Sequence, residues 1–227
     1  MRQSLAIDRR RAALILIDLQ EEQRHVPEYA VEGLDTVLGH AGRLLAAARA
    51  SGVMVIHTAF KRDFQKVPPR PLEFRAPDGG PAFSDKGSPL TAICREVEPH
   101  HGEPVLFKND ASAFCEGELE PLLRDAAVEW LIVAGVWTEA CVAATVRDAI
   151  ARGIRVLLVK DACGSGTRAM HQTGILNLAN RLCGGAVSDT AAAARLIMGD
   201  VAEVWVPQRP VPILFSYADA EKAFETL

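Results

Sequence analysis

Short apolar runs without alternating polarity are the sequence feature that most restricts the fold of this chain. Strands with one face in water alternate polar and apolar residues, whereas strands buried on both faces are continuously apolar. The four clearest runs are rich in Val, Ile and Leu and cover residues 12–18, 53–58, 128–135 and 154–160. Two weaker candidates lie at 104–108 and 203–206. We therefore expect these segments to form strands of a buried, mainly parallel sheet.

Amphipathic helical patterns separate most of these runs. They cover residues 33–51, 116–126, 139–152 and 170–182, and glycine follows several of them. Glycine is the preferred residue just past a helix C-terminus. Strand alternating with helix predicts an α/β fold, doubly wound and Rossmann-like, whose mainly parallel six-stranded sheet has helices on both faces. With 227 residues, 49% of them hydrophobic, the chain is expected to form a single domain over 1–227.

Two segments depart from this regular pattern. The excursion, residues 62–89, holds prolines at 68, 69, 71, 77 and 81 together with a Gly-Gly pair. A structureless insertion of this length in a compact domain is usually functional, so we expect a lid. The tail, residues 207–227, begins with three prolines and continues with Ile213, Leu214 and Phe215. The tail has two alternative roles that the sequence does not distinguish: covering the edge of the sheet, or docking on a neighbouring subunit.

Composition excludes several classes of function. A net charge of -4 and a pI near 5.9 offer no basic surface for phosphate backbones, so nucleic acid is not expected as a partner. The apolar runs are too short to cross a bilayer, and no signal-type cleavage region follows the N-terminus, which predicts a cytoplasmic protein without membrane contact. The five cysteines form no Cys-x-x-Cys pair. We therefore expect reduced thiols and no zinc site.

Three chemically active side chains stand at or just beyond the ends of predicted strands, where open parallel sheets bind ligands. Asp18 and Lys108 each end a run, and Cys141 follows another in the first turn of a predicted helix. Singly, each has a commoner structural interpretation: a turn-capping Asp, a solvated Lys and a core Cys. Together they predict a cleft in which lysine stabilises a thiolate while the carboxylate accepts the thiol proton. The positive end of the helix is expected to lower the thiol pKa.

Three blocks around these residues resemble the signature blocks of isochorismatase-like cysteine hydrolases. They read Leu-Ile-Asp-Leu-Gln up to residue 20, Phe-Lys-Asn-Asp-Ala-Ser-Ala-Phe at 107–114 and Val-Ala-Gly-Val-Trp-Thr-Glu-Ala-Cys-Val-Ala-Ala-Thr at 133–145. The resemblance implies a catalytic triad of Asp18, Lys108 and Cys141 and a cis peptide between Val136 and Trp137. It also implies an oxyanion hole made by the backbone N–H groups of Trp137 and Cys141. In that mechanism a covalent thioester-like intermediate forms and ammonia or an amine leaves.

Six further residues are candidates for the substrate pocket: Gln20, Asn109, Phe114, Thr138, Arg168 and His171. For most of them a bracing or packing role is an equal or better alternative. Arg168 lies at a distance beyond Cys141 where amide-cleaving relatives often carry an arginine for a substrate carboxylate. A surface ion pair is the competing interpretation for this arginine, and the sequence does not choose between the two.

Within the family, the chain resembles the N-carbamoylsarcosine, ureidoacrylate, maleamate and biuret amidohydrolases more than the nicotinamidases. Nicotinamidases carry an Asp-x-His metal motif after the second strand, and residues 57–64 lack it, so we expect no metal and no cofactor. The expected substrate is a small amide, ureide or N-carbamoyl compound, and the family implies a homo-oligomer, either dimer or tetramer. Two alternatives stay open: vinyl-ether hydrolysis of the isochorismatase type, and a noncatalytic member that binds or assembles.

Overall fold

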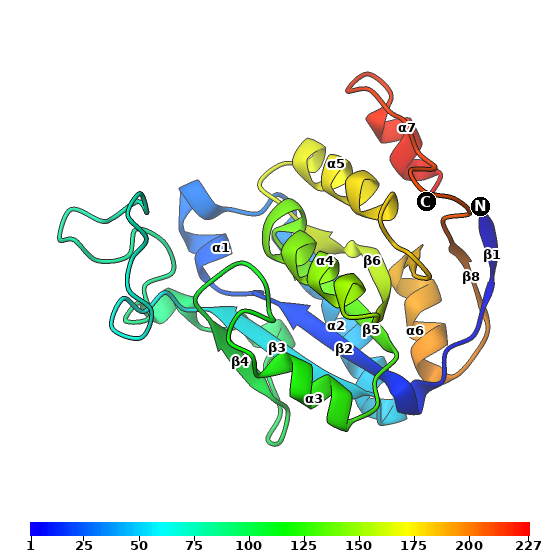
Figure 1. The fold of residues 1–227 in the computed structure, drawn as a ribbon, viewed down its shortest axis with the longest axis horizontal. Helices are drawn as coiled ribbons and strands as arrows, with labels where there is room; N and C mark the ends of the chain where they lie inside the picture. The colour runs from blue at the N-terminus through cyan, green and yellow to red at the C-terminus, as the bar shows by residue number, and fades with distance from the viewer.

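The computed structural model describes all residues, 1–227, and is organised around one eight-stranded sheet (Figure 1). The strand order is β1-β8-β7-β6-β5-β2-β3-β4. The strands are β1 (Arg2–Leu5), β2 (Ala12–Ile17), β3 (Met54–Phe60), β4 (Val105–Lys108), β5 (Trp130–Val136), β6 (Arg155–Gly164), β7 (Ala186–Ser188) and β8 (Ala202–Trp205). The six strands from β7 to β4 are parallel, whereas β8 and β1 pair antiparallel at one edge. The predicted α/β class with a mainly parallel sheet is therefore confirmed.

The prediction of six strands was wrong by two. β7 has only three residues, too few to stand out as an apolar run. β1 is mostly exposed and its sequence, Arg-Gln-Ser-Leu, has no apolar pattern. Its role is to cover the edge of β8, with Arg2 opposite Trp205 and Leu5 opposite Ala202. Pairing along an edge depends on backbone hydrogen bonds, which leave no hydrophobic signal in the sequence.

Helices cover both faces of the sheet (Figure 1). The helices are α1 (Glu22–His25), α2 (Leu34–Ser51), α3 (Leu119–Asp125), α4 (Ala143–Ala151), α5 (Arg168–Ala179), α6 (Thr190–Met198) and α7 (Ala220–Glu225). α2 and α6 pack on one face, and α3, α4 and α5 on the other. The helix α2 ends where predicted, because Gly52 adopts φ 74° and its N–H closes the last turn on Ala48 O. None of the helices is both long and apolar enough to cross a membrane.

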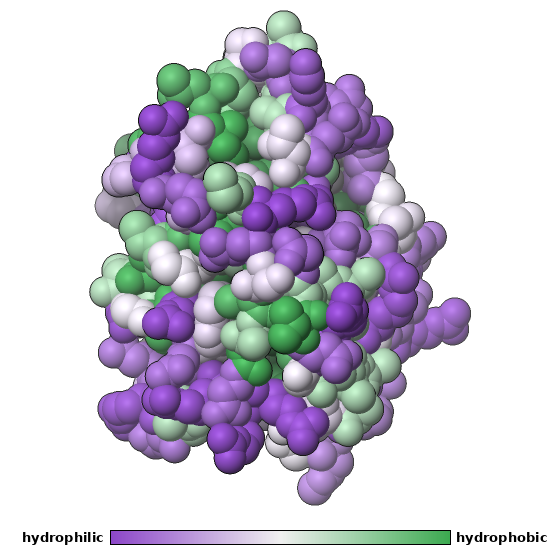
Figure 2. All heavy atoms as spheres, turned by 90° about the vertical axis from the view of Figure 1, so that its right-hand side faces the viewer, coloured by the Kyte–Doolittle hydropathy of each residue, from purple (hydrophilic) through white to green (hydrophobic).

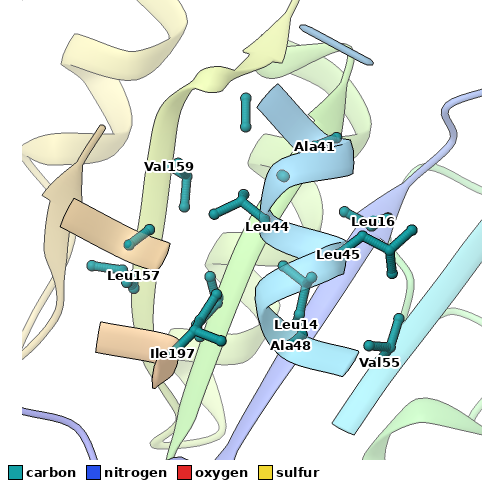
Figure 3. Close-up of a cluster of buried hydrophobic side chains, with 14 of the residues drawn as sticks. Leu14, Leu16, Ala41, Leu44, Leu45, Ala48, Val55, Leu157, Val159 and Ile197 are labelled. Carbon is teal, nitrogen blue, oxygen red and sulfur yellow. The ribbon is translucent and has the colours of Figure 1, made fainter. Parts of the chain in front are cut away.

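Alternate residues of the central strands supply two hydrophobic cores. Along β2, Leu14 and Leu16 face one core, and Ile15 and Ile17 face the other. Figure 3 shows the first core, where Leu44 and Leu45 of α2 meet side chains of β2, β3 and β6. Because side chains point alternately to opposite faces of a strand, a strand covered on both sides is apolar throughout. This explains the continuous apolar runs of the sequence.

The excursion, residues 62–89, has no helix or strand of its own and extends from the body beside β3 and β4 (Figure 1). Within it, the Arg62 guanidinium forms two bonds of 2.6 and 2.7 Å with Glu73, and Asp63 N ties its start to the body by donating to Asn109 Oδ1 at 2.7 Å. It is tied down again near its end, where Tyr29 Oη donates to Ala82 O at 2.7 Å. The tip stays apolar and open, with Leu72 94% and Phe74 89% exposed.

The tail, residues 207–227, folds back on α5 of its own chain. Asn180 exchanges two hydrogen bonds with the backbone of Ile213, at 2.8 and 2.9 Å, and α7 packs against α5. Figure 2 shows the face on which the termini lie, hydrophilic over most of its area with hydrophobic groups gathered in places. Leu214 and Tyr217 of the tail are 87% and 96% exposed. β1 is the edge strand on this side of the sheet, and the tail packs on α5 instead of pairing with that edge.

Candidate active site

Asp18, Lys108 and Cys141 come together at the carboxyl ends of the strands. Nζ of Lys108 lies 2.7 Å from Oδ2 of Asp18 and 3.3 Å from Sγ of Cys141. The three residues are 3%, 1% and 9% exposed, respectively. The topology explains the convergence, because β2 lies between β3 and β5 and β4 follows β3. Residues 90 and 33 positions apart along the chain thus form one buried cluster.

The backbone around Asp18 turns sharply out of β2. Asp18 has φ 51°, a conformation uncommon for residues other than glycine. Its N–H still donates to Thr58 O at 3.2 Å, and the Thr58 hydroxyl donates to Oδ1 at 2.7 Å. The two carboxylate oxygens therefore have different partners, a hydroxyl on one and an ammonium on the other. This fixes the orientation of the carboxyl group.

Lys108 holds its charge despite complete burial. Its ammonium donates to the carbonyl oxygens of Asp110 and Ala111, at 3.0 and 2.9 Å, and lies 4.5 Å from the ring centroid of Phe60. Burial pushes the pKa of Lys108 down, but Asp18 and Cys141 push it up, and the pKa ends above its ordinary value. The lysine is therefore a permanent cation beside the sulfur.

Cys141 rests as a thiol, which corrects the expectation that the helix end lowers its pKa. Burial raises the pKa of Cys141, the Asp18 carboxylate raises it further, and Lys108 opposes this only in part. The residue also lies in a π-helical turn, Thr138–Val142, which precedes α4. A position near the start of a helix does not reveal how deeply a thiol is buried or which carboxylate lies beside it, and here these two effects on the pKa are the largest. The sulfur therefore needs a proton acceptor at the moment of reaction.

The peptide between Val136 and Trp137 is cis, as the resemblance implied. The backbone N–H of Trp137 donates to no group of the protein, so it is free to bind a ligand oxygen. Gly135 makes this approach possible with φ 130°, since a Cβ there would lie 2.1 Å from the carbonyl oxygen of Ile17. β5 pairs with β2 in parallel, with Gly135 beside Ile17, and this pairing brings the Trp137 backbone to the end of the Asp18 strand.

Gln20 and Thr138 brace the site. The Gln20 side chain donates to Phe60 O and Thr91 O at 3.0 and 2.9 Å and accepts from Phe60 N at 2.8 Å. The Thr138 hydroxyl donates to Gly164 O at 2.9 Å and lies 2.8 Å from Nδ1 of His171. Both side chains are completely buried. Their bonds hold the ends of neighbouring strands together, which is the bracing role rather than contact with a substrate.

The contacts of Asn109 and Phe114 also hold parts of the fold together. Asn109 Oδ1 accepts from Asp63 N at 2.7 Å, and Asn109 Nδ2 donates to Glu116 at 3.2 Å, so the amide fastens the excursion to β4. Phe114 is buried in the core on the α3 and α4 face, with the guanidinium of Arg152 at 4.5 Å from its ring centroid. Neither side chain makes a hydrogen bond or ring contact with the triad.

Arg168 and His171 lie at a hollow of about 440 Å³, lined also by Glu32, Asp161 and Phe224. The Arg168 side chain is 65% exposed, and its guanidinium pairs with Glu221 of the tail at 2.6 Å. Burial lowers the pKa of His171 to about 4, so this imidazole is neutral. None of the triad residues lines this hollow. The surface ion pair is thus the arrangement that the structure shows for Arg168.

Sequence reasoning missed four groups beside the triad. Three aromatic residues, Tyr29, Phe60 and Phe83, join Trp137 in an aromatic cluster, with Phe83 at its centre. The fourth is Glu22, a carboxylate only 3% exposed. Tyr29 ends a short 3-10 turn eleven residues after Asp18, and Phe83 lies in the excursion, so no apolar pattern could have placed either ring. Glu22 stands only four residues after Asp18, but it begins a separate short helix, and a charged residue there is usually exposed rather than buried.

One other cluster has side chains that could ligate a metal: Glu21, Cys94 and Glu96, whose ligand atoms lie within 4.8 Å of one another. The Arg24 guanidinium is ion-paired with both Glu21 and Glu96, at 3.1 and 2.8 Å. Burial raises the pKa of Cys94 to about 12, so its thiol is protonated. An arginine therefore already supplies the positive charge at this position.

The chain is similar in sequence and in structure to known proteins. The isochorismatase domain model matches residues 12–192. The maleamate amidohydrolase of Pseudomonas putida is 33% identical over 179 residues, covering 74% of this chain and 79% of that protein. The N-carbamoylsarcosine amidase of an Arthrobacter species is 29% identical over 186 residues, covering 75% and 66%. The crystal structure of an isochorismatase family protein from Desulfovibrio vulgaris superposes with a TM-score of 0.72 at 30% identity, covering 80% and 95%. The chain therefore belongs to the isochorismatase family of hydrolases.

Proposed function

We propose that this chain hydrolyses a C–N bond of a small amide, ureide or N-carbamoyl compound through a covalent intermediate on Cys141. The observation that carries the proposal is the position of the Lys108 ammonium, 2.7 Å from the Asp18 carboxylate and 3.3 Å from the Cys141 sulfur. A nucleophile, a proton acceptor and a cation meet in a site from which water is largely excluded. These are the groups that nucleophilic acyl transfer requires.

The first half of the reaction forms the intermediate. The Cys141 thiol transfers its proton to Asp18 as the sulfur attacks the substrate carbonyl carbon, and the carbonyl oxygen becomes an oxyanion. Lys108 stabilises the developing thiolate. Backbone N–H groups of Trp137 and Cys141 bind the oxyanion, each worth about 3–4 kcal/mol in comparable enzymes. The tetrahedral species then expels the amine, which takes the proton held by Asp18, and a thioester or thiocarbamate remains on the sulfur.

The second half returns the site to its starting state. Asp18 accepts a proton from a water molecule, and the resulting hydroxide attacks the acyl carbon on the sulfur. The C–S bond breaks, Cys141 recovers its proton from Asp18, and the acid product leaves. The raised pKa of the Cys141 thiol fits this scheme, because a thiol that stays protonated at rest needs a carboxylate within reach. A thiol with a raised pKa is a poor leaving group, so the departing thiolate depends on stabilisation by the Lys108 ammonium.

The relatives support the type of bond. The names of two of them, maleamate amidohydrolase and N-carbamoylsarcosine amidase, describe cleavage of amide and carbamoyl C–N bonds. The proposed activity rests on the shared family together with the retained cysteine. Vinyl-ether hydrolysis needs protonation of the substrate and gives no task to a sulfur nucleophile. The placement of Cys141 within the triad therefore favours C–N cleavage.

The test is a panel of small amides, ureides and N-carbamoyl compounds, with isochorismate included, assayed for ammonia or amine release. Wild-type protein is expected to turn over at least one nitrogen compound, and mass spectrometry of a rapidly quenched reaction is expected to show an acyl or carbamoyl adduct on Cys141. Cys141→Ala is expected to abolish both signals, whereas Cys115→Ser, at an exposed cysteine, keeps them. Cleavage of isochorismate alone, or full activity in Cys141→Ala, would contradict the proposal.

A further inference from the structure

The aromatic cluster borders the reacting groups. The Phe83 ring centroid lies 4.7 Å from that of Tyr29, 5.3 Å from Phe60 and 5.6 Å from Trp137. Phe60 is the ring beside the Lys108 ammonium, and Trp137 supplies an oxyanion N–H. Aromatic faces attract flat groups by stacking and cations through the ring quadrupole, and they repel anions. The walls next to the scissile bond therefore favour flat, uncharged or positively charged groups.

Glu22 is a buried carboxylate without a cationic partner. The Ser84 hydroxyl donates to Oε1 of Glu22, and Gln23 Nε2 lies 3.5 Å from the same oxygen. Both partners are uncharged, and Ser84 adjoins Phe83 in the chain. Burial raises the pKa of Glu22, the Ser84 bond lowers it in part, and the nearby Asp18 raises it. A buried carboxylate of this kind gains stability from any ligand that brings it a positive charge or N–H donors.

The cations around the site are already committed. Lys108 is bound to Asp18, to the Cys141 sulfur and to two backbone carbonyls. Arg62 is bound through Nε and Nη2 to the Glu73 carboxylate and through Nη1 to Val67 O and Asn109 Oδ1. Arg168 is on the surface with Glu221. Asp18 and Glu22, which is near enough to Asp18 to feel its charge, are thus two buried carboxylates beside one buried ammonium, that of Lys108. A substrate carboxylate would add a third negative charge, and none of these three cations is free to receive it.

We infer that Glu22 and the aromatic cluster select the substrate class: amides or ureides whose acyl part is flat and uncharged or bears a cationic or N–H donor group. Glu22 is the specificity-determining residue, and substrates that carry a carboxylate are disfavoured. This inference rests on the proposed C–N hydrolase activity. It separates this chain from relatives of the maleamate type, since maleamate is itself a carboxylate.

Three probes with the same scissile carboxamide test the inference: benzamide, 3-(aminomethyl)benzamide and 3-carbamoylbenzoate. Their ammonia release gives kcat/KM for a neutral, a cationic and an anionic ring of similar shape. In the wild-type protein, 3-carbamoylbenzoate is expected to be at least tenfold poorer than benzamide, and 3-(aminomethyl)benzamide at least as good as benzamide. Glu22→Gln is expected to lower the ratio of cationic to anionic turnover at least tenfold, mostly through KM.

Two matched variants complete the experiment. Glu21→Gln removes the same charge from the neighbouring position, where the carboxylate is paired with Arg24, and is expected to leave the ratio within twofold. Arg168→Gln is expected to leave it unchanged as well. If 3-carbamoylbenzoate is the best probe, or if Arg168→Gln selectively abolishes its turnover, the inference is overturned while the hydrolase activity stands. If no carboxamide or ureide of any charge is cleaved, the proposed function itself fails. The wild-type probe order decides the question even if Glu22→Gln does not fold.

Discussion

The Lys108 ammonium lies 3.3 Å from the Cys141 sulfur in a cluster almost closed to solvent. The same nitrogen is 2.7 Å from Asp18, so one cation is shared between a base and a nucleophile. Transfer of the thiol proton to Asp18 leaves the total charge of the cluster unchanged and moves the negative charge from one partner of Lys108 to the other. The reaction can therefore begin without bringing a new charge into a buried site.

Loss of Lys108 is expected to damage both stability and activity. In Lys108→Met the buried Asp18 carboxylate loses its cation, which should lower the free energy of unfolding by about 3–5 kcal/mol. Turnover of any substrate found should fall at least 1000-fold, because the thiolate is no longer stabilised. Urea unfolding and ammonia release measure the two effects.

The double variant Lys108→Met with Asp18→Asn separates the effect on stability from the effect on activity. Removing the orphaned carboxylate should recover at least half of the lost unfolding free energy but none of the activity. Equal instability of the single and double variants would show that the ion pair is not the source of the loss.

The Cys141 thiol is expected to be slow toward iodoacetamide in the absence of substrate. At pH 7 its modification should be at least tenfold slower than that of the exposed Cys183, because Cys141 is 9% exposed and burial and Asp18 raise its pKa. Asp18→Asn removes one cause of the raised pKa and should speed the labelling of Cys141. Peptide mass spectrometry gives both rates. Preferential labelling of Cys141 in the wild-type protein would mean that the thiolate exists at rest.

The parts of the site that the sequence predicted are those fixed by strand ends. Asp18 and Lys108 close apolar runs, and in a parallel sheet the ends of such runs meet on one side. Cys141 follows the longest run, so its neighbourhood was predictable, although its protonation was not. The pKa of the thiol depends on burial and on the Asp18 carboxylate, and both are properties of the packed site.

Contacts made by irregular segments escaped prediction. Phe83 reaches the site from the excursion, whose course is set by single bonds such as that of Tyr29 to Ala82 rather than by a repeating pattern. Arg168 stands at a suitable distance along the chain, yet the tail offers Glu221 as its partner. Sequence distance from a nucleophile does not tell which carboxylate an arginine will find, because the tail can fold back from many residues away.

Thr58 is expected to act as a positioning residue for Asp18. Its hydroxyl donates to Oδ1 at 2.7 Å, and Thr58→Val removes this bond with little change in shape. A hydrogen bond to a charged group is worth about 1.5–3 kcal/mol, so kcat should fall roughly 10- to 150-fold with little change in KM. Thr145→Val, which removes a buried hydroxyl that only accepts from Ala113 N, should leave kcat within threefold. A change of KM alone in Thr58→Val would contradict the positioning role.

Acid is expected to destabilise the fold in part through His171. In the folded chain burial lowers the pKa of His171 to about 4, whereas its ordinary value is 6.5. Between these pH values the unfolded chain binds a proton that the folded chain does not, so the free energy of unfolding falls as the pH falls. The full effect of such a shift is up to about 3 kcal/mol. Urea unfolding at pH 7 and pH 5 should therefore show a smaller loss of stability in His171→Gln than in the wild-type protein. Equal losses would mean that the imidazole is protonated in the folded chain, and that the Thr138 hydroxyl and the ring of Phe224 surround a charged group instead of a neutral one.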